Sequence, residues 1–204
     1  MQTKTISVDK WLPFTLFTGF TAFVCYFIAI AGFLPYKISI LCAFAFGPLL
    51  MLALLGMYHI CKDWKNSLWL QSAVVFNIVA TAFVTMMFVV QQSMFLFHDK
   101  FVLQPQPTVT PEQLKLMLKE VNSVQLGMDV AWDIFICAGT FLLALSFWGH
   151  PALKKFFLAI GMVLSVLALA FNMWYFPVPP GETGSIDFGP FVALWYIIML
   201  LLLY

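Results

Sequence analysis

Two carboxylates spaced four residues apart, Asp129 and Asp133, are the side chains in this sequence with the clearest potential for chemistry. They lie in residues 127–135, inside a run that otherwise has the composition of a membrane-spanning helix. Residues four apart share one face of a helix, and these two would be separated by about 6 Å along its axis. An ionisable group in a hydrocarbon-facing segment is costly and by default indicates a functional site. Such a pair could bind a cation, carry a proton, or act as acid and base on a bound substrate.

A purely structural role is open to both aspartates as well. Asp129 is predicted at the outer membrane interface, where water can solvate it. If its helix begins near Gly127, the positive end of that helix would also favour both carboxylates. Asp133 lies about 6 Å deeper, next to Trp132 and Ile134, and its hydrogen bonds could serve only to hold helices together.

The composition predicts a membrane protein. Of the 204 residues, 63% are hydrophobic and 9% are charged, and the mean hydropathy is +0.96. A soluble domain carries about 25% charged residues, so these charges could not cover a surface exposed to water. The net charge of +1 gives no indication of nucleic-acid binding. All ten basic residues are lysines, which excludes bidentate recognition of phosphate by a guanidinium group.

Motifs of the common enzyme and metal sites are absent from the sequence. It contains no HExxH, GxSxG, Walker or GxGxxG pattern. The four cysteines form no CxxC pair and lie in or beside apolar runs, so we expect reduced, packed thiols. His59 and His150 are predicted at the water boundary, whereas haem ligands would face each other inside the bilayer. We therefore expect no cofactor and no metal, and we favour a protein that is not an enzyme.

Six apolar runs predict an all-α, polytopic membrane protein that forms one integral membrane domain over residues 1–204. The predicted spans of this six-transmembrane-helix bundle are 11–35, 38–61, 68–97, 124–149, 156–176 and 188–204. Pro48, near the middle of the second span, predicts a kink. Residues 98–123 are predicted to form an external loop with one amphipathic helix. Thr110, Pro111 and Gln113 have the pattern of a capped helix start, and apolar residues then follow at helical spacing.

Six spans would put both termini on the same side of the membrane. The N-terminal tail and the turns on that side contain six lysines: Lys4, Lys10, Lys62, Lys65, Lys154 and Lys155. The opposite side has four, three of them in the long loop. This bias in the short loops favours cytoplasmic N- and C-termini. The first apolar run is too long for a cleaved signal peptide, and we interpret it as a retained span.

Polar side chains of other predicted spans are expected near the depth of Asp133. The fifth span contributes a stripe of small and polar residues that ends at Asn172, of the kind that lets membrane helices approach closely. Facing polar stripes on the third, fourth and fifth spans would form a seam that opens outward. We predict a pocket in this seam whose ligand-binding residues are Asp129, Asp133, Asn172, Gln92, Tyr175 and Trp132.

Three motifs in the C-terminal 80 residues carry a resemblance to a known family. They are Asp129-x-x-Trp132-Asp133-x-Phe135, Asn172-x-x-x-Phe176-Pro-x-Pro-Pro180, and Asp187-x-Gly189-Pro190 followed by Leu194-Trp195-Tyr196. In them the chain resembles a family of small bacterial multi-pass membrane proteins that is catalogued as a domain of unknown function. The resemblance implies a helical bundle of a bacterial inner membrane and leaves the activity open. It also implies that Asp133, Asn172 and Asp187 are neighbours on the outer side.

Several functions are compatible with this sequence. We favour an integral membrane protein whose pocket binds a small cationic or lipid-like ligand, or a helix of a membrane partner or of a second copy. One alternative is a small proton-coupled transporter with Asp133 as the titrating group, although the two halves of the chain show no matching repeat. The others are an intramembrane lipid-modifying enzyme and a structural subunit of a larger membrane complex.

Overall fold

The computed structural model describes residues 5–31, 34–62, 64–103, 109–176, 178 and 180–203. Over these residues the fold is all-helical, with six α-helices and one short 3₁₀ helix. The elements are α1 (Thr5–Ala31), α2 (Tyr36–Cys61), α3 (Leu68–Leu103), α4 (Pro111–Ser146), α5 (Lys155–Tyr175), η1 (Pro180–Thr183) and α6 (Gly189–Leu203). The prediction of an all-α fold is confirmed, with six α-helices over the described residues.

Five of the helices are long and apolar enough to cross a membrane. These segments are Lys10–Ala31, Tyr36–Cys61, Leu68–Phe101, Pro111–Ser146 and Lys155–Tyr175. Helix α6 is equally apolar but has 15 residues, so it is about 22 Å long against a hydrocarbon core of about 30 Å. Large apolar side chains such as Phe17 and Phe156 are exposed on the outside of the bundle. That arrangement is stable in lipid and unfavourable in water.

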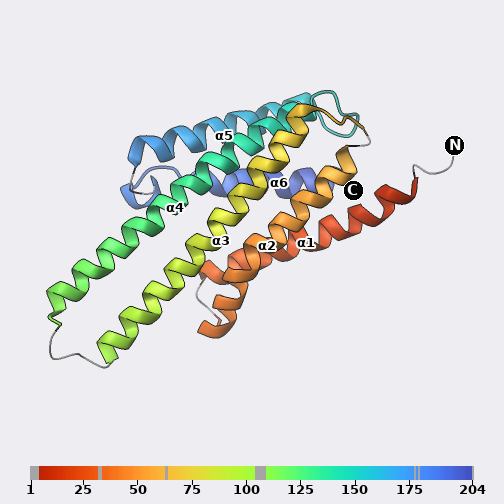
Figure 1. The fold of residues 1–204 in the computed structure, drawn as a ribbon. Helices are drawn as coiled ribbons and strands as arrows, with labels where there is room; N and C mark the ends of the chain where they lie inside the picture. The colour runs from red at the N-terminus through yellow and green to blue at the C-terminus, as the bar shows by residue number, and fades with distance from the viewer. Residues whose placement is uncertain are drawn as a thin grey trace.

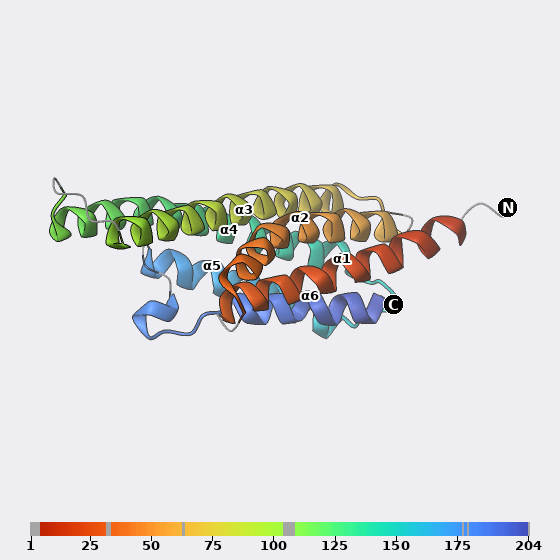
Figure 2. The ribbon, with the colours of Figure 1, turned by 90° about the horizontal axis from the view of Figure 1, so that it is seen from below.

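Successive helices run up and down the bundle, and both termini lie at the same end (Figure 1). Helices α3 and α4 lie along one face, and α1 and α6 lie along the opposite face (Figure 2). The hairpin of α3 and α4 extends well past the other helices, away from the termini.

Helix α2 bends part-way along its length, as Figure 2 shows. Pro48 lies inside this helix, where it removes one backbone hydrogen bond and forces the chain to kink. The preceding Gly47 faces α3, because a Cβ placed there would lie 2.8 Å from the carbonyl oxygen of Thr81. The predicted kink is therefore present where α2 packs most closely on α3.

The segment between the third and fourth predicted spans is more helical than expected. Residues 98–123 were expected to be an external loop, but α3 continues to Leu103 and α4 begins at Pro111. The cluster of His98, Asp99 and Lys100 lowers the local hydropathy without interrupting the helix. Residues 104–108 lie outside the described residues, and so do residues 32 and 33 near the predicted end of the first span.

The predicted helix start at Thr110 is present, but the helix does not end before the fourth span. The Gln113 backbone N–H donates to Thr110 Oγ1 at 3.2 Å, and the Thr110 N–H donates to Gln113 Oε1 at 2.9 Å. From this capping box α4 runs without a break through Gly127 to Ser146. The amphipathic stretch is therefore the first part of α4 and not a separate helix.

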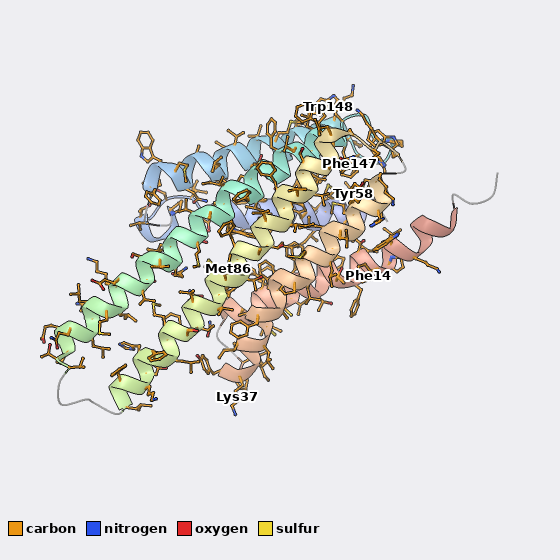
Figure 3. The ribbon with its side chains drawn as sticks, viewed as in Figure 1. Phe14, Lys37, Tyr58, Met86, Phe147 and Trp148 are labelled. Atoms are coloured by element: carbon orange, nitrogen blue, oxygen red, sulfur yellow. The ribbon has the colours of Figure 1, made fainter. Side chains whose placement is uncertain are left out.

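Aromatic side chains gather at the end of the bundle that holds the termini. Figure 3 shows Tyr58, Phe147 and Trp148 at this end, whereas Lys37 marks the start of α2 at the other. Between α4 and α5, outside the membrane-spanning helices, the ring of His150 lies edge-on to that of Trp64, with centroids 4.8 Å apart.

The charged form of His150 is disfavoured in this position. Partial burial lowers the pKa of His150 below its ordinary value of 6.5, because the imidazolium loses hydration. In addition, Nδ1 accepts the backbone N–H of Ala152 at 3.2 Å, and only an unprotonated nitrogen can do so.

We predict that stability falls when the pH drops through about 6.5. Below this value the unfolded chain binds a proton at His150 while the folded chain still resists it, so the unfolding free energy decreases as the pH is lowered. The unfolding temperature in detergent should fall between pH 7.5 and 5.5. His150→Asn keeps an acceptor for Ala152 and should be less sensitive to this change. Equal pH dependence in the wild type and in His150→Asn would contradict the assignment.

A second prediction concerns two glycines of the same helix. A Cβ at Gly139 would lie 2.6 Å from Asn77 Cγ, whereas one at Gly127 would meet nothing within 4 Å. Gly139→Ala should therefore lower the free energy of unfolding by about 1–3 kcal/mol through overpacking. Gly127→Ala should raise it by up to about 1 kcal/mol, because alanine is the better helix former. Thermal unfolding of both variants in detergent checks this, and shifts of the same sign would show the close α3–α4 contact to be wrong.

Candidate ligand-binding site

Asp133 lies on α4 at the junction of two spaces in the bundle. The first is an outer cleft of about 10 Å³ between α4 and α5. Its lining includes Asp129 and Asp133 from α4, Asn172 from α5, and Pro180 at the start of η1. Asp129 and Asp133 are four residues apart on one helix and therefore face the same way. The cleft is the more polar of the two spaces.

The second space is an inner cavity of about 70 Å³ in the centre of the bundle. Helices α1, α2, α4, α5 and α6 all contribute to its lining, which is largely aromatic and aliphatic. The lining includes Phe23, Phe46, Leu50, Trp132, Ile136 and Val192. Among the described residues of this lining, Asp133 is the one with an acidic side chain. The site therefore has a polar outer part and an apolar inner part, with Asp133 common to both.

The two spaces differ in the size of the group that each can hold. The outer cleft has room for about one group of the size of a water molecule, which needs roughly 10–15 Å³ of cavity volume. The inner cavity is several times larger and offers mainly apolar contacts. A ligand that fills both would need a very small polar head and a bulkier apolar body.

Negative charge concentrates at the outer part of the site. Asp129, Asp133 and Asp187 all lie close enough to interact electrostatically with Tyr26 of α1, and Asp129 and Asp187 also act on Asp133. Among the described residues that line the cleft or the cavity, none is basic. The field in the cleft therefore favours a cation.

Asp187 also fixes the start of α6 beside the inner cavity. Its Oδ1 accepts the backbone N–H of Gly189 at 2.8 Å, and Gly189 lines the cavity. A carboxylate at the beginning of a helix satisfies an otherwise unpaired N–H and interacts favourably with the helix dipole. The cavity wall formed by α6 is therefore held in place from the outer end.

Deeper in the bundle, a hydrogen-bonded network ties α6 to α3 and α4. The Tyr196 hydroxyl donates to Asn77 Oδ1 at 3.0 Å and lies 3.0 Å from Thr140 Oγ1. Thr140 has one hydroxyl proton, which it can donate to the Tyr196 oxygen or to the carbonyl oxygen of Ile136, 2.6 Å away. Among the described residues, no partner is present for Asn77 Nδ2, although this amide is fully buried. Tyr196 is thus both a wall of the cavity and the link between three helices.

The structure brings four of the six predicted site residues to these two spaces. Asp129, Asp133 and Asn172 line the outer cleft, and Trp132 lines the inner cavity beside Asp133. Gln92 on α3 lines neither space.

Tyr175 also lines neither space. The centroid of its ring lies 6.4 Å from that of Phe171 on the same helix. The expected seam of three polar stripes is formed only in part. The α4 and α5 stripes meet at the outer cleft, to which α3 contributes none of the described lining residues, and α6 packs on the other end of the α5 stripe. A Cβ at Gly161 of the α5 stripe would overlap the ring of Trp195 from α6. Trp195 Nε1 donates to the carbonyl oxygen of Phe157 at 3.0 Å, which fastens α6 to α5.

Sequence reasoning missed Tyr196 and the cavity wall on α6. A signal was present, because α6 is apolar on all sides apart from one hydroxyl group. In such a helix the single hydroxyl, Tyr196, must find a partner on a neighbouring helix. The aromatic part of the lining, such as Phe23 and Phe46, has no comparable signal in a chain with 23 phenylalanines.

Across the described residues no group of three His, Cys, Asp or Glu side chains is arranged to hold a metal ion. Comparison with known proteins gave no match to any family model, curated protein or solved structure. The chemistry of the site must therefore be argued from its own residues.

Removing the Tyr196 hydroxyl should destabilise the bundle. Tyr196→Phe leaves Asn77 Oδ1 buried without its donor, which costs about 1–3 kcal/mol of unfolding free energy. The matched control Tyr175→Phe removes a hydroxyl from α5, outside both spaces, and should change it by less than about 0.5 kcal/mol. Thermal or denaturant unfolding in detergent measures both. Equal effects would mean that the network does not hold α6.

Proposed function

We propose that this chain is an integral membrane protein that binds a cationic amphiphile with a primary amine as its head. The head occupies the outer cleft beside Asp133, and the apolar body fills the inner cavity. The observation that carries this proposal is the position of Asp133, which lines the polar cleft and the apolar cavity together. An amphiphile is the class of molecule that has both a polar head for the cleft and an apolar body for the cavity.

The charge of the head follows from the surrounding carboxylates. An ammonium group about 4 Å from one carboxylate gains about 4 kcal/mol at an effective dielectric constant of about 20. Three aspartates act in this region and no basic side chain lines it among the described residues, so an anionic head would be repelled. Asn172 adds an amide that can hydrogen-bond to the head.

The size of the head follows from the volume of the cleft. A primary ammonium is close to a water molecule in size and fits a space of about 10 Å³. A trimethylammonium head is much larger and carries no N–H to donate to Asp133 or Asn172. The site should therefore discriminate between alkylamines by their head group.

The proposal includes a specific membrane topology. We infer that α6 crosses the membrane together with the five longer helices and that both termini are cytoplasmic. Five lysines support this orientation, because they lie at or beside helix ends on the side of the bundle that holds both termini. They are Lys10, Lys62, Lys65, Lys154 and Lys155. The outer cleft then opens to the opposite side. The family resemblance of the C-terminal 80 residues supports the inner membrane of a bacterium as the location.

The proposed membrane topology also includes the projecting hairpin of α3 and α4. Helices α3 and α4 have 36 residues each and are thus about 54 Å long, so both exceed the hydrocarbon core by more than 20 Å. We infer that their joined ends emerge on the outer side. The amphipathic start of α4 is then the external helical segment expected from the sequence.

Octylamine, octanol and trimethyloctylammonium test the proposal, because they share one chain and differ in the head. We expect octylamine to raise the unfolding temperature of the detergent-solubilised protein by several degrees more than the other two. At a ligand concentration of about 100 Kd the stabilisation is about 2.7 kcal/mol, and each kcal/mol is worth about 2–4 °C in a chain of this size.

Two aspartate variants complete the test. Asp133→Asn should remove the additional effect of octylamine, whereas the control Asp99→Asn, at the far end of α3, should keep it. If octylamine stabilises the Asp133→Asn protein as well as the wild type, the proposed site is wrong.

A further inference from the structure

A second apolar space lies on the outside of the bundle, between α4 and α5. Figure 1 shows these two helices close together near the turn of residues 147–154 and diverging toward the other end. The groove between them has a volume of about 270 Å³. Its lining consists of Cys137, Ala138, Phe141 and Leu142 from α4 and Ser165, Val166 and Leu169 from α5.

The position of the groove determines what can fill it. It lies in the middle of α5 and in the last third of α4, two helices long and apolar enough to cross a membrane. Val163 and Val166 of α5 are 56% and 54% exposed and so face the surroundings of the bundle. The single hydroxyl in its lining, that of Ser165, already donates to the carbonyl oxygen of Met162 at 2.8 Å. At this depth the surrounding medium is hydrocarbon, and an alkyl chain is the body that matches the groove.

Small side chains lie where the lining of the groove meets the lining of the inner cavity. Cys137 lines both spaces and is 3% exposed. On α5, Ala168 lines the cavity while the adjacent Leu169 lines the groove. A thiol and a methyl group are therefore part of the boundary at this level, and both are much smaller than an aromatic ring.

The groove is also in register with the outer cleft. Cys137 follows Asp133 by four residues on α4, so the outer end of the groove begins about 6 Å below that carboxylate. On α5, Asn172 lines the cleft and Leu169, one turn deeper, lines the groove. A molecule with its head in the cleft would have its chain directly beside the groove.

We propose that the groove between α4 and α5 is a lateral entrance, through which the alkyl chain of a long-chain amine passes from the bilayer past Cys137 into the inner cavity. This inference rests on the proposed function, and it identifies the ligand as a membrane-dissolved lipid that does not arrive from water. The cationic head stays at the level of Asp133 during this movement. The chain exchanges the apolar bilayer for the apolar cavity, which costs little because no polar group of the lipid has to cross hydrocarbon.

A photoreactive long-chain primary amine tests the entrance. The probe is hexadecylamine with a diazirine in the middle of its chain, dissolved in phosphatidylcholine liposomes that contain the full-length protein. After illumination, mass spectrometry identifies the labelled residues. We expect adducts both in the groove, at Phe141 or Leu142, and in the cavity, at Leu50 or Val192.

Two variants of one helix separate entrance from binding. Val166→Trp fills the groove, whereas Val163→Trp adds the same ring one turn away at a site of nearly equal exposure. We expect Val166→Trp to reduce the adducts in the cavity by about tenfold or more. Val163→Trp should leave them at the wild-type level.

The possible results distinguish the two proposals. Cavity adducts that persist at the wild-type level in Val166→Trp would overturn the lateral entrance. Adducts confined to the groove in the wild type would overturn it too, because the chain would then never reach the cavity. Neither result touches the Asp133-dependent stabilisation by octylamine in detergent, which is measured without a bilayer and tests the binding site itself.

Discussion

The hydroxyl of Tyr196 holds three helices together in a region where water is not available as a partner. It reaches Asn77 on α3 and Thr140 on α4, each at 3.0 Å, and the neighbouring Trp195 binds the backbone of α5. In hydrocarbon a polar group without a protein partner is costly, so these contacts fix both the depth and the rotation of α6. The short helix has little else to orient it, because its surface is apolar on every side.

The candidate site follows from this constraint. With α6 fixed, Gly189, Val192 and Tyr196 form one wall of the inner cavity, and α4 brings Asp133 to the opposite side. Elsewhere the helices meet closely, as Gly139 does with Asn77 and Gly161 does with Trp195. The cavity is thus a space left where bulky side chains meet, beneath an acidic cleft. The carboxyl group of Asp133 lies at the boundary between the polar cleft and the apolar cavity.

Much of the fold and part of the site were predictable from the sequence. Long apolar runs and Pro48 predicted the helices and the kink, and the four-residue spacing predicted that Asp129 and Asp133 share a face. The ends of α3 and α4 were not predictable from hydropathy, because charged residues such as Lys100 lower the local hydropathy without ending the helix. Tyr196 was missed because the placement of α6 depends on packing between helices distant in the sequence. For the same reason the sequence did not reveal that Gln92 and Tyr175 line neither space.

The uninterrupted length of α4 has a mechanical consequence. One continuous ladder of backbone hydrogen bonds joins Pro111 at the projecting tip to Asp133 and on to Ser146, beside the turn that connects α4 to α5. If that turn acts as the fulcrum, Asp133 lies about 20 Å from it and Pro111 about 53 Å. A displacement of about 1 Å at the carboxylate then becomes about 2.7 Å at the tip. With this geometry, the continuous helix α4 would convert a small movement at Asp133 into a larger one at the projecting tip.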